Sequence, residues 1–255
     1  MGNVSERRKQ PPQVGVSVVI LALGPVPQSD VGAGAASSGM GSTLWMPLVK
    51  RVRQPFLGQW ALPGGGLRAD HSLEQSAYAA LESTTSLHPK YLEQLYTFGD
   101  PARSHGGLPM VSIVYWALVG EADGRIDFAG GDNVKWFPVN HLPELAFDHR
   151  TIVEYAINRL RGKIESPDIA TRLVGERFTL SQLHDVYEAI AGQRIDLANF
   201  RRKMLASGLL EDTGEKLRIG RNRPAAVYRY SRKPERHPNR TTLELLSRMT
   251  TRYPH

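Results

Sequence analysis

The 255-residue sequence predicts an α+β domain followed by a smaller helical domain that ends in a β-hairpin. Before residue 162, short apolar runs typical of buried strands alternate with amphipathic helical segments. After it, short helices with clear capping residues follow each other. Charge divides the chain in the same way: residues 1–159 hold 13 Lys and Arg against 14 Asp and Glu, and residues 160–255 hold 19 against 11. We therefore expect two units, the second with a polyanion such as nucleic acid as its partner.

The front unit is predicted to hold four strands and two helices. Strands are expected at 16–23, 44–49, 111–119 and 134–137, where valine, isoleucine and leucine dominate. A helix is expected from Ser72 to Ser86, because Ser72 suits an N-cap and Gln75 stands at the capping-box position. A second is expected at 148–161, where apolar residues recur at helical spacing. Residues 24–42 are rich in Gly, Ala, Ser and Pro and are expected to form a mobile loop.

The composition limits the kinds of site, and two sequence signals bear on the compartment. There is no cysteine, which excludes a disulfide scaffold and a Cys-based zinc site. Basic residues 7–9 precede an apolar run, as in a signal peptide, but "QPPQ" separates the two and the run is strand-like. No run approaches the ~20 apolar residues of a membrane helix. We therefore expect a cytoplasmic protein with no membrane partner.

The stretch "KRVRQPFLGQWALPGGGL", Lys50–Leu67, ends in glycines shortly before the first helix. Glycines let backbone N–H groups approach phosphate oxygens, a helix N-terminus favours anions, and guanidinium groups match phosphate geometry. The candidate ligand-binding residues are Arg51, Arg53, Trp60, Gly64, Gly65, Gly66, Arg103 and His105. Two alternatives stay open: the charged side chains are solvated surface groups, and Trp60 and Phe56 pack in the core instead of stacking a base.

This stretch and the helix after it resemble the Nudix hydrolase box, G-x5-E-x7-R-E-U-x-E-E-x-G-U, where U is aliphatic. Gly65, Leu81 and Leu87 fit the pattern, and the resemblance covers roughly residues 14–160. It implies an α/β sandwich. In that family, glutamates on the helix hold divalent cations.

Every acidic position of the box is replaced in this sequence. His71 stands for the first Glu, Ala79–Ala80 for Arg-Glu, Ser83–Thr84 for Glu-Glu, and Ser86 for the second Gly. Glu74 and Glu82 are directed away from the helix face of positions 80, 83 and 84. We therefore expect no metal, no cofactor and no catalytic residue, and a site that binds a diphosphate without cleaving it.

The back half, from Phe178 to Gly214, reads as a helix pair. Thr179, with Gln182, caps the first helix, Asp196 caps the second and Gly208 ends it. Leu197, Phe200 and Met204 form the inner stripe of the second helix; Asn199, Arg202, Lys203 and Ala206 face outward. Asn and Arg read adenine and guanine edges, and Lys suits phosphate.

A basic β-hairpin is expected next, from Lys216 to Tyr230, with Arg221 and Arg223 at its tip. A helix-turn-helix followed by such a wing predicts a winged-helix domain whose second helix enters the major groove. The candidate DNA-binding residues are Asn199, Arg201, Arg202, Lys203, Arg218, Arg221 and Arg223. The alternative is a helix pair with a basic, solvated face.

Together the two halves resemble the Nudix-related transcriptional regulators of NAD metabolism, the NrtR family. The resemblance implies a homodimeric repressor of NAD biosynthesis or salvage genes that binds a double-stranded DNA operator and senses ADP-ribose or a related nucleotide. We expect domains at 1–161 and 162–235 and a tail at 236–255. Two other functions stay open: an active hydrolase that uses acids outside the box, and a DNA-binding protein whose front half only dimerises.

Overall fold

A computed structural model describes residues 11–27, 41–89, 91–104, 109–120, 126–164, 166–218 and 223–231. The first sheet holds β1 (Gln13–Pro25), β2 (Ser42–Lys50), β3 (Trp60–Ala61), β4 (Gly64–Gly66), β5 (Tyr91–Phe98), β6 (Met110–Val119) and β7 (Val134–Pro138). The second holds β8 (Phe178–Thr179), β9 (Leu210–Leu217) and β10 (Ala225–Tyr230). The α-helices are α1 (Leu73–Thr85), α2 (His149–Lys163), α3 (Pro167–Val174), α4 (Leu180–Ala191) and α5 (Leu197–Ala206), with 3-10 turns η2 (Pro101–Ser104) and η4 (Val139–His141).

The first sheet is a mixed sheet between two helices. Its main path is β3-β2-β1-β6-β5, with β4 paired to β1 and β7 to β2, and only the β1–β6 pair is parallel. Along β1, Val18 and Ile20 share a core cluster with Leu81 of α1, whereas Val19 and Leu21 share one with residues of α2. Both faces of β1 are therefore covered, which is why its sequence is continuously apolar. The α/β sandwich predicted from the sequence is confirmed.

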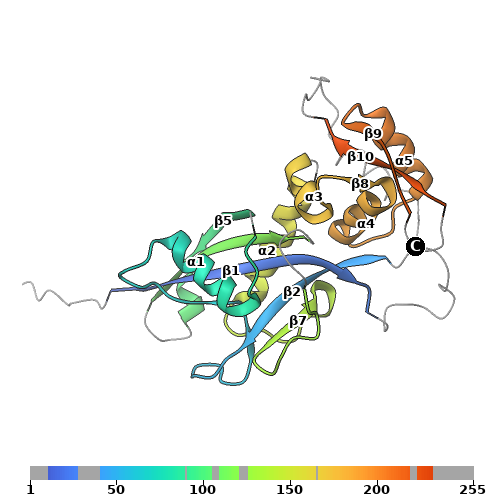
Figure 1. The fold of residues 1–255 in the computed structure, drawn as a ribbon. Helices are drawn as coiled ribbons and strands as arrows, with labels where there is room; N and C mark the ends of the chain where they lie inside the picture. Colours follow the sequence, from blue (N-terminus) through green and yellow to red (C-terminus); the bar gives the residue numbers. More distant parts are fainter. Residues whose placement is uncertain are drawn as a thin grey trace, which may run out of the picture.

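The second unit has the winged-helix order α3, β8, α4, α5, β9, β10, with a small sheet in the order β8-β10-β9. It lies at the end of the first sheet, where α4 contacts β2 and α3 contacts β6 (Figure 1). One continuous apolar core runs from β2 of the first unit into α4 of the second. The predicted winged-helix class is confirmed, and the two units are packed together rather than joined only by a linker.

The helix starts follow the capping residues that the sequence offers. Ser72 and Thr179 each form a complete capping box, with Gln75 and Gln182 respectively. The Asp196 side chain accepts a hydrogen bond from the backbone N–H of Asn199 at 2.7 Å. Gly208 follows the end of α5 with φ +70°. These local signals were predictable because a cap needs only residues three positions apart.

Two predicted segments differ from the structure. Gly24 and Pro25 belong to β1 and pair with Thr43 and Ser42, so the strands extend into both ends of the expected loop. Packing requires a glycine at position 24, because a Cβ there would lie 2.6 Å from the Trp45 ring. The prediction of mobility falls on residues 28–40, outside the described ones.

The wing hairpin also begins earlier than predicted, at Leu210 instead of Lys216. The sequence of the first half of β9, "LEDTG", does not alternate between apolar and polar residues. In the structure Leu210, Glu211 and Thr213 are all only half-buried, so this part of the strand does not need a strong apolar pattern. Strand β5 was not predicted either. It lies at the edge of the first sheet and is mostly half-buried or exposed, so its sequence is of mixed polarity. Half-buried strands carry a weak period-two signal.

The proposed boundary at residue 162 stays a prediction. Helix α2 runs through it to Lys163 before α3 begins at Pro167. The tail at 236–255 lies outside the described residues. None of the helices in the described part of the chain is long and apolar enough to cross a membrane.

Candidate functional site

The three glycines form the short strand β4 against β1, rather than a flexible turn at the start of α1. Gly64, Gly65 and Gly66 pair with Ser17, Val16 and Gly15. A Cβ on Gly64 would lie 2.4 Å from the Val16 carbonyl oxygen, whereas Gly65 and Gly66 face open space. Gly64 is thus required by the close approach of two backbones. The glycines are exposed, but Leu67–Ser72 separates them from the helix.

Helix α1 carries hydroxyl groups where the Nudix box has its paired glutamates. Ser83 Oγ and Thr84 Oγ1 both donate to the Ala80 carbonyl, at 3.0 and 2.7 Å. These hydroxyls therefore bond the helix itself. Glu82 is exposed, and Glu74, in the first turn, lies close enough to reinforce the rise that burial causes in the Tyr115 pKa. The box positions offer no carboxylate and do not fit a magnesium ion.

Arg51 and Arg53 lie on the loop that leaves β2, and they differ in their surroundings. The Arg51 guanidinium carbon stands 4.6 Å from the centre of the Phe147 ring, and its Nε donates to the Pro55 carbonyl at 2.8 Å. Partial burial lowers the pKa of Arg51. Arg53 is exposed. The structure therefore holds one guanidinium on an aromatic face and leaves the other in solvent.

The aromatic residues of this loop pack within the protein. Trp60 is half-buried, and its ring meets that of Phe137 edge-on at 5.1 Å between centroids. The Phe56 ring meets that of Phe147 at 4.7 Å. Of the two alternatives for these rings, the structure favours packing.

Arg103, one of the predicted ligand-binding residues, has its guanidinium occupied by groups of the protein itself. Its side chain is 2% exposed, and Nε and Nη2 form a two-pronged ion pair with the Asp148 carboxylate at 3.0 and 2.9 Å. Its Nη1 donates to the Phe98 carbonyl at 2.8 Å. The buried guanidinium thus ties η2 to the start of α2. His105 lies outside the described residues.

His149, the first residue of α2, was missed by the sequence analysis. Its Nδ1 accepts a hydrogen bond from the backbone N–H of Leu62 at 3.0 Å, and Leu62 stands two residues before the glycine strand. Burial lowers the pKa of His149 to about 4, a change that the nearby Asp148 opposes and that Arg103 and Arg51 assist. A neutral imidazole is therefore the form that anchors β4. The sequence offered no signal, because 87 positions separate the partners.

Helix α5 presents the predicted basic face. Phe200 and Met204 are buried, whereas Arg201 and Arg202 are exposed and Asn199 and Lys203 lie half-buried at the side. Arg202 Nη2 donates to Asn199 Oδ1 at 2.7 Å, and Arg201 Nη2 donates to Ser181 Oγ at 2.8 Å. Leu205 is 52% exposed on the same outer side, an apolar group that the sequence analysis did not single out.

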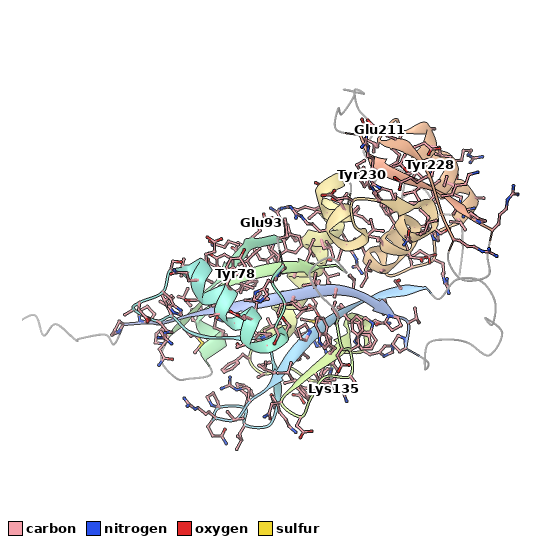
Figure 2. The ribbon with its side chains drawn as sticks, viewed as in Figure 1. Tyr78, Glu93, Lys135, Glu211, Tyr228 and Tyr230 are labelled. Carbon is pink, nitrogen blue, oxygen red and sulfur yellow. The ribbon has the colours of Figure 1, made fainter. Side chains whose placement is uncertain are left out.

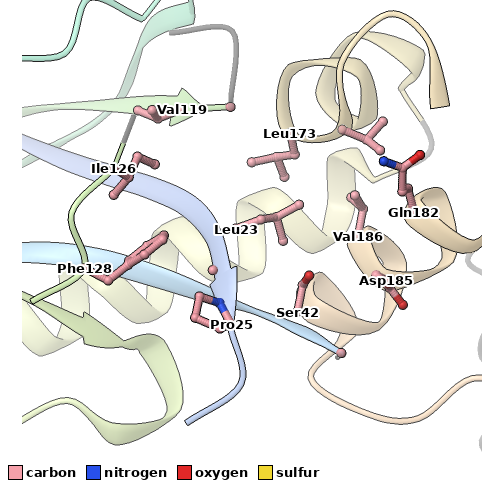
Figure 3. Close-up of a pocket in the computed structure, with 14 residues that line it drawn as sticks. Leu23, Pro25, Ser42, Val119, Ile126, Phe128, Leu173, Gln182, Asp185 and Val186 are labelled. Carbon is pink, nitrogen blue, oxygen red and sulfur yellow. The ribbon is translucent and has the colours of Figure 1, made fainter. Parts of the chain in front are cut away.

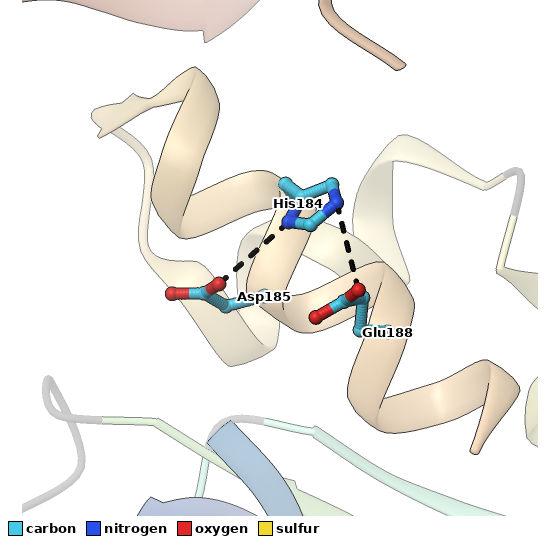
Figure 4. A group of neighbouring side chains, drawn as sticks. All are labelled: His184, Asp185 and Glu188. Atoms are coloured by element: carbon cyan, nitrogen blue, oxygen red, sulfur yellow. Dashed lines mark ion pairs between the residues drawn. The ribbon is translucent and has the colours of Figure 1, made fainter. Parts of the chain in front are cut away.

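The turn between α4 and α5 is held by a polar clamp. His184 Nε2 lies 2.7 Å from the Ile195 carbonyl oxygen, and Glu188 Oε1 accepts from the Ile195 N–H at 2.7 Å. His184, Asp185 and Glu188 gather their ligand atoms as a metal site would (Figure 4). Two of the three side chains, His184 and Glu188, already bond Ile195 in the turn. The cluster is therefore explained by a structural role, which is to hold α4 and α5 at a fixed angle.

The wing presents cations on both sides of its tip. Arg218 and Arg223 are exposed, and residues 219–222, which include Arg221, are outside the described ones. Ion pairs brace the strands: Arg177 to Glu215 at 2.8 Å and Arg229 to Glu211 at 3.0 Å. Figure 2 places Glu211 with Tyr228 and Tyr230 on this small sheet. Strands β9 and β10 are therefore braced, and the exposed Arg218 and Arg223 stand on either side of residues 219–222.

The fold and these two surfaces define a class: a Nudix-type sandwich fused to a winged-helix DNA-binding domain. Residues 33–156 match the NUDIX domain, and residues 170–230 match the NrtR DNA-binding winged helix domain. The ADPR responsive transcriptional repressor NtrR of Acinetobacter baylyi is 31% identical over 188 residues, covering 72% of this chain and 74% of that protein.

A solved structure agrees over most of the chain. Crystalline Shewanella oneidensis NrtR complexed with a 27mer DNA aligns with a TM-score of 0.65 and 35% identity, over 86% of this chain and 93% of that one. An ADP-ribose pyrophosphatase of Methanocaldococcus jannaschii is 34% identical over 110 residues, 42% of this chain and 62% of that enzyme. The chain belongs to the NrtR family, as the sequence resemblance implied.

Proposed function

We propose that this protein is a transcriptional repressor that binds operator DNA through α5 and the wing and responds to ADP-ribose or a related NAD-derived nucleotide. The main support for this proposal is the outward face of α5. Arg201 and Arg202 are exposed on that face, whereas Phe200 and Met204 are buried on the opposite side of the helix. The Acinetobacter relative is described as an ADPR responsive repressor, and the Shewanella relative was crystallised with DNA. Both relatives align over most of their length.

In this proposal α5 lies in the major groove. Arg202 reads a guanine edge with its fork, Asn199 reads a neighbouring base and Leu205 contacts a thymine methyl group. Arg201 and Lys203, together with the wing residues Arg218, Arg221 and Arg223, contact phosphates. The His184–Glu188 clamp on Ile195 fixes the angle at which α5 is presented.

The nucleotide is proposed to bind at the Nudix-like half, over the exposed glycine strand. Arg51 and Arg53 supply positive charge, and the Phe147 ring under Arg51 holds that guanidinium in place. Arg103 and His149 support the site indirectly, because they fix the start of α2 and Leu62, two residues before β4. Titration calorimetry with ADP-ribose and with NAD tests this. If neither binds, the front half serves only for dimerisation, which is the purely DNA-binding alternative.

We infer that the bound nucleotide is not hydrolysed. The support is the set of box positions on α1, where hydroxyls bonded to the Ala80 carbonyl replace the paired acids. An assay with ADP-ribose and magnesium or manganese is expected to show negligible turnover. The second candidate function is an active hydrolase that uses acids outside the box, and the pyrophosphatase relative favours it. Turnover near one per second, ordinary for an enzyme, would establish that candidate.

We further propose that the protein acts as a cytoplasmic homodimer on genes of NAD biosynthesis or salvage. One winged helix offers few base-reading side chains, so useful specificity needs two half-sites. Dimer symmetry then appears as operator symmetry. Selection of binding sites from random DNA is expected to yield pseudo-palindromes. A single asymmetric half-site bound by a monomer would contradict this.

A further inference from the structure

A cavity of about 760 Å³ lies between the two domains (Figure 3). Its walls on the sandwich side include Leu23, Ile126 and Phe128, and those on the winged-helix side include Leu173 and Val186. The volume is within the range of small-molecule pockets, about 300–1,000 Å³. A molecule in this cavity would touch both domains at once.

The cavity is distinct from the proposed nucleotide site. The glycine strand pairs with β1 at Gly15–Ser17, whereas the cavity meets β1 at Leu23–Pro25. Leu23 lies six positions beyond Ser17 along the strand, a span of roughly 20 Å. The described residues that line the cavity include no lysine or arginine, so the charge of a diphosphate has no counterpart there. The described lining therefore suits a neutral or cationic ligand better than an anionic one.

The polar groups of the cavity come mainly from one turn of α4. Gln182 Oε1 is held by the Thr179 backbone N–H at 2.9 Å, which leaves its amide NH2 group for the cavity. Asp185 is next along the same face, and Ser42 adds a hydroxyl. Apolar walls with a few convergent polar groups are typical of ligand sites.

Asp185 lies beside the His184 ring in the described structure. His184 Nδ1 lies 3.7 Å from Asp185 Oδ1, and the other ring nitrogen lies 2.7 Å from the Ile195 carbonyl oxygen. Burial raises the pKa of Asp185 and the neighbouring Glu188 adds to the rise, whereas His184 and Arg194 oppose it. A carboxylate in such surroundings gains most from a donor or a cation supplied by a ligand.

The walls around the cavity are tightly packed. A Cβ on Gly24 would lie 2.7 Å from the Phe128 ring, and one on Gly120 would lie 2.4 Å from the Arg172 carbonyl oxygen. At Gly120 the end of β6 thus touches the backbone of α3 directly. The cavity persists beside these close contacts, so it is not a sign of generally loose packing between the domains.

We propose that the interdomain cavity is a second small-molecule site, which takes a neutral or cationic ligand with an apolar, ring-sized body and a hydrogen-bond donor for Asp185. The proposal does not depend on the nucleotide function of the front half. A ligand there adds contacts across the domain boundary and stabilises their packed arrangement.

Benzamidine and benzoate test the proposal, because they share shape and size and differ in charge. With the full-length protein and ligand-detected NMR, benzamidine is expected to bind with a Kd of roughly millimolar, ordinary for so small a ligand. Benzoate is expected not to bind. Asp185→Asn should weaken benzamidine at least about tenfold, the effect of losing a charge-assisted bond. Glu154→Gln, on the exposed side of α2, removes the same charge and should change nothing.

A second variant tests the cavity without changing Asp185. Ile126→Trp places a larger ring in the sandwich wall of the cavity, so it should weaken benzamidine binding while ADP-ribose binding stays as in the wild type. Circular dichroism confirms that each variant is folded. Equal binding of benzoate, benzamidine binding that neither variant changes, or no benzamidine binding at about tenfold above the expected Kd would each overturn the proposal.

Discussion

Replacing Arg202 by alanine tests whether α5 is the element that reads DNA. Arg202 is exposed, and the hydrogen bond from its Nη2 to Asn199 Oδ1 at 2.7 Å is exposed as well. Exposed bonds of this kind stabilise the free protein little, so the free energy of unfolding should change by no more than about 0.5 kcal/mol. The change in DNA affinity then reports the interface alone.

The expected magnitude follows from one lost bidentate contact to guanine. Such a contact contributes about 1–3 kcal/mol, which corresponds to a Kd raised about 5- to 150-fold at the cognate operator. Preference at one base position should flatten, because no other side chain takes over that edge. Arg202→Lys keeps the charge and loses the fork, so it should lose the base preference and keep the salt dependence.

Fluorescence anisotropy on the selected operator and its single-base variants measures both effects at about 150 mM salt. Lys135→Ala is the matched control, because it removes one exposed positive charge from β7 in the other domain. Unchanged operator affinity of Arg202→Ala would refute the argument. The helix from Leu197 to Ala206 would then not be the reading element.

Three further results are expected. Arg223→Ala should weaken binding to all sequences alike and reduce the slope of log K against log salt by about 0.9, and a sequence-dependent loss would contradict a phosphate contact. Gly64→Ala should destabilise the fold by about 2 kcal/mol or more in urea unfolding, because its Cβ meets the Val16 carbonyl, whereas Gly65→Ala faces open space and should not. His149 has a folded pKa of about 4 against an ordinary 6.5, so the unfolded state binds more protons between these values, and stability falls by about 3 kcal/mol as the pH drops from 6.5 to 4. His149→Asn should remove that part of the pH dependence; an identical pH profile would show that the imidazole is not buried neutral.

The sequence by itself determined the features that depend on neighbours along the chain. The capping boxes at Ser72 and Thr179 need only residues three apart, and the continuous apolar run of β1 signals a strand covered on both faces. The basic face of α5 follows from its helical period, since Phe200 and Met204 must point inward. The loss of the box acids needed only an alignment of spacing.

Tertiary structure decided what depends on residues far apart. Nothing local marks Arg103 as the buried partner of Asp148, 45 positions away, instead of a phosphate ligand. Nothing local links His149 to Leu62, or gives Gly64 its packing role against β1. The cavity beside Asp185 exists only because the end of β1 meets α4. In each case burial and the chosen partner set the chemistry of the side chain, and both arise only once the chain has folded.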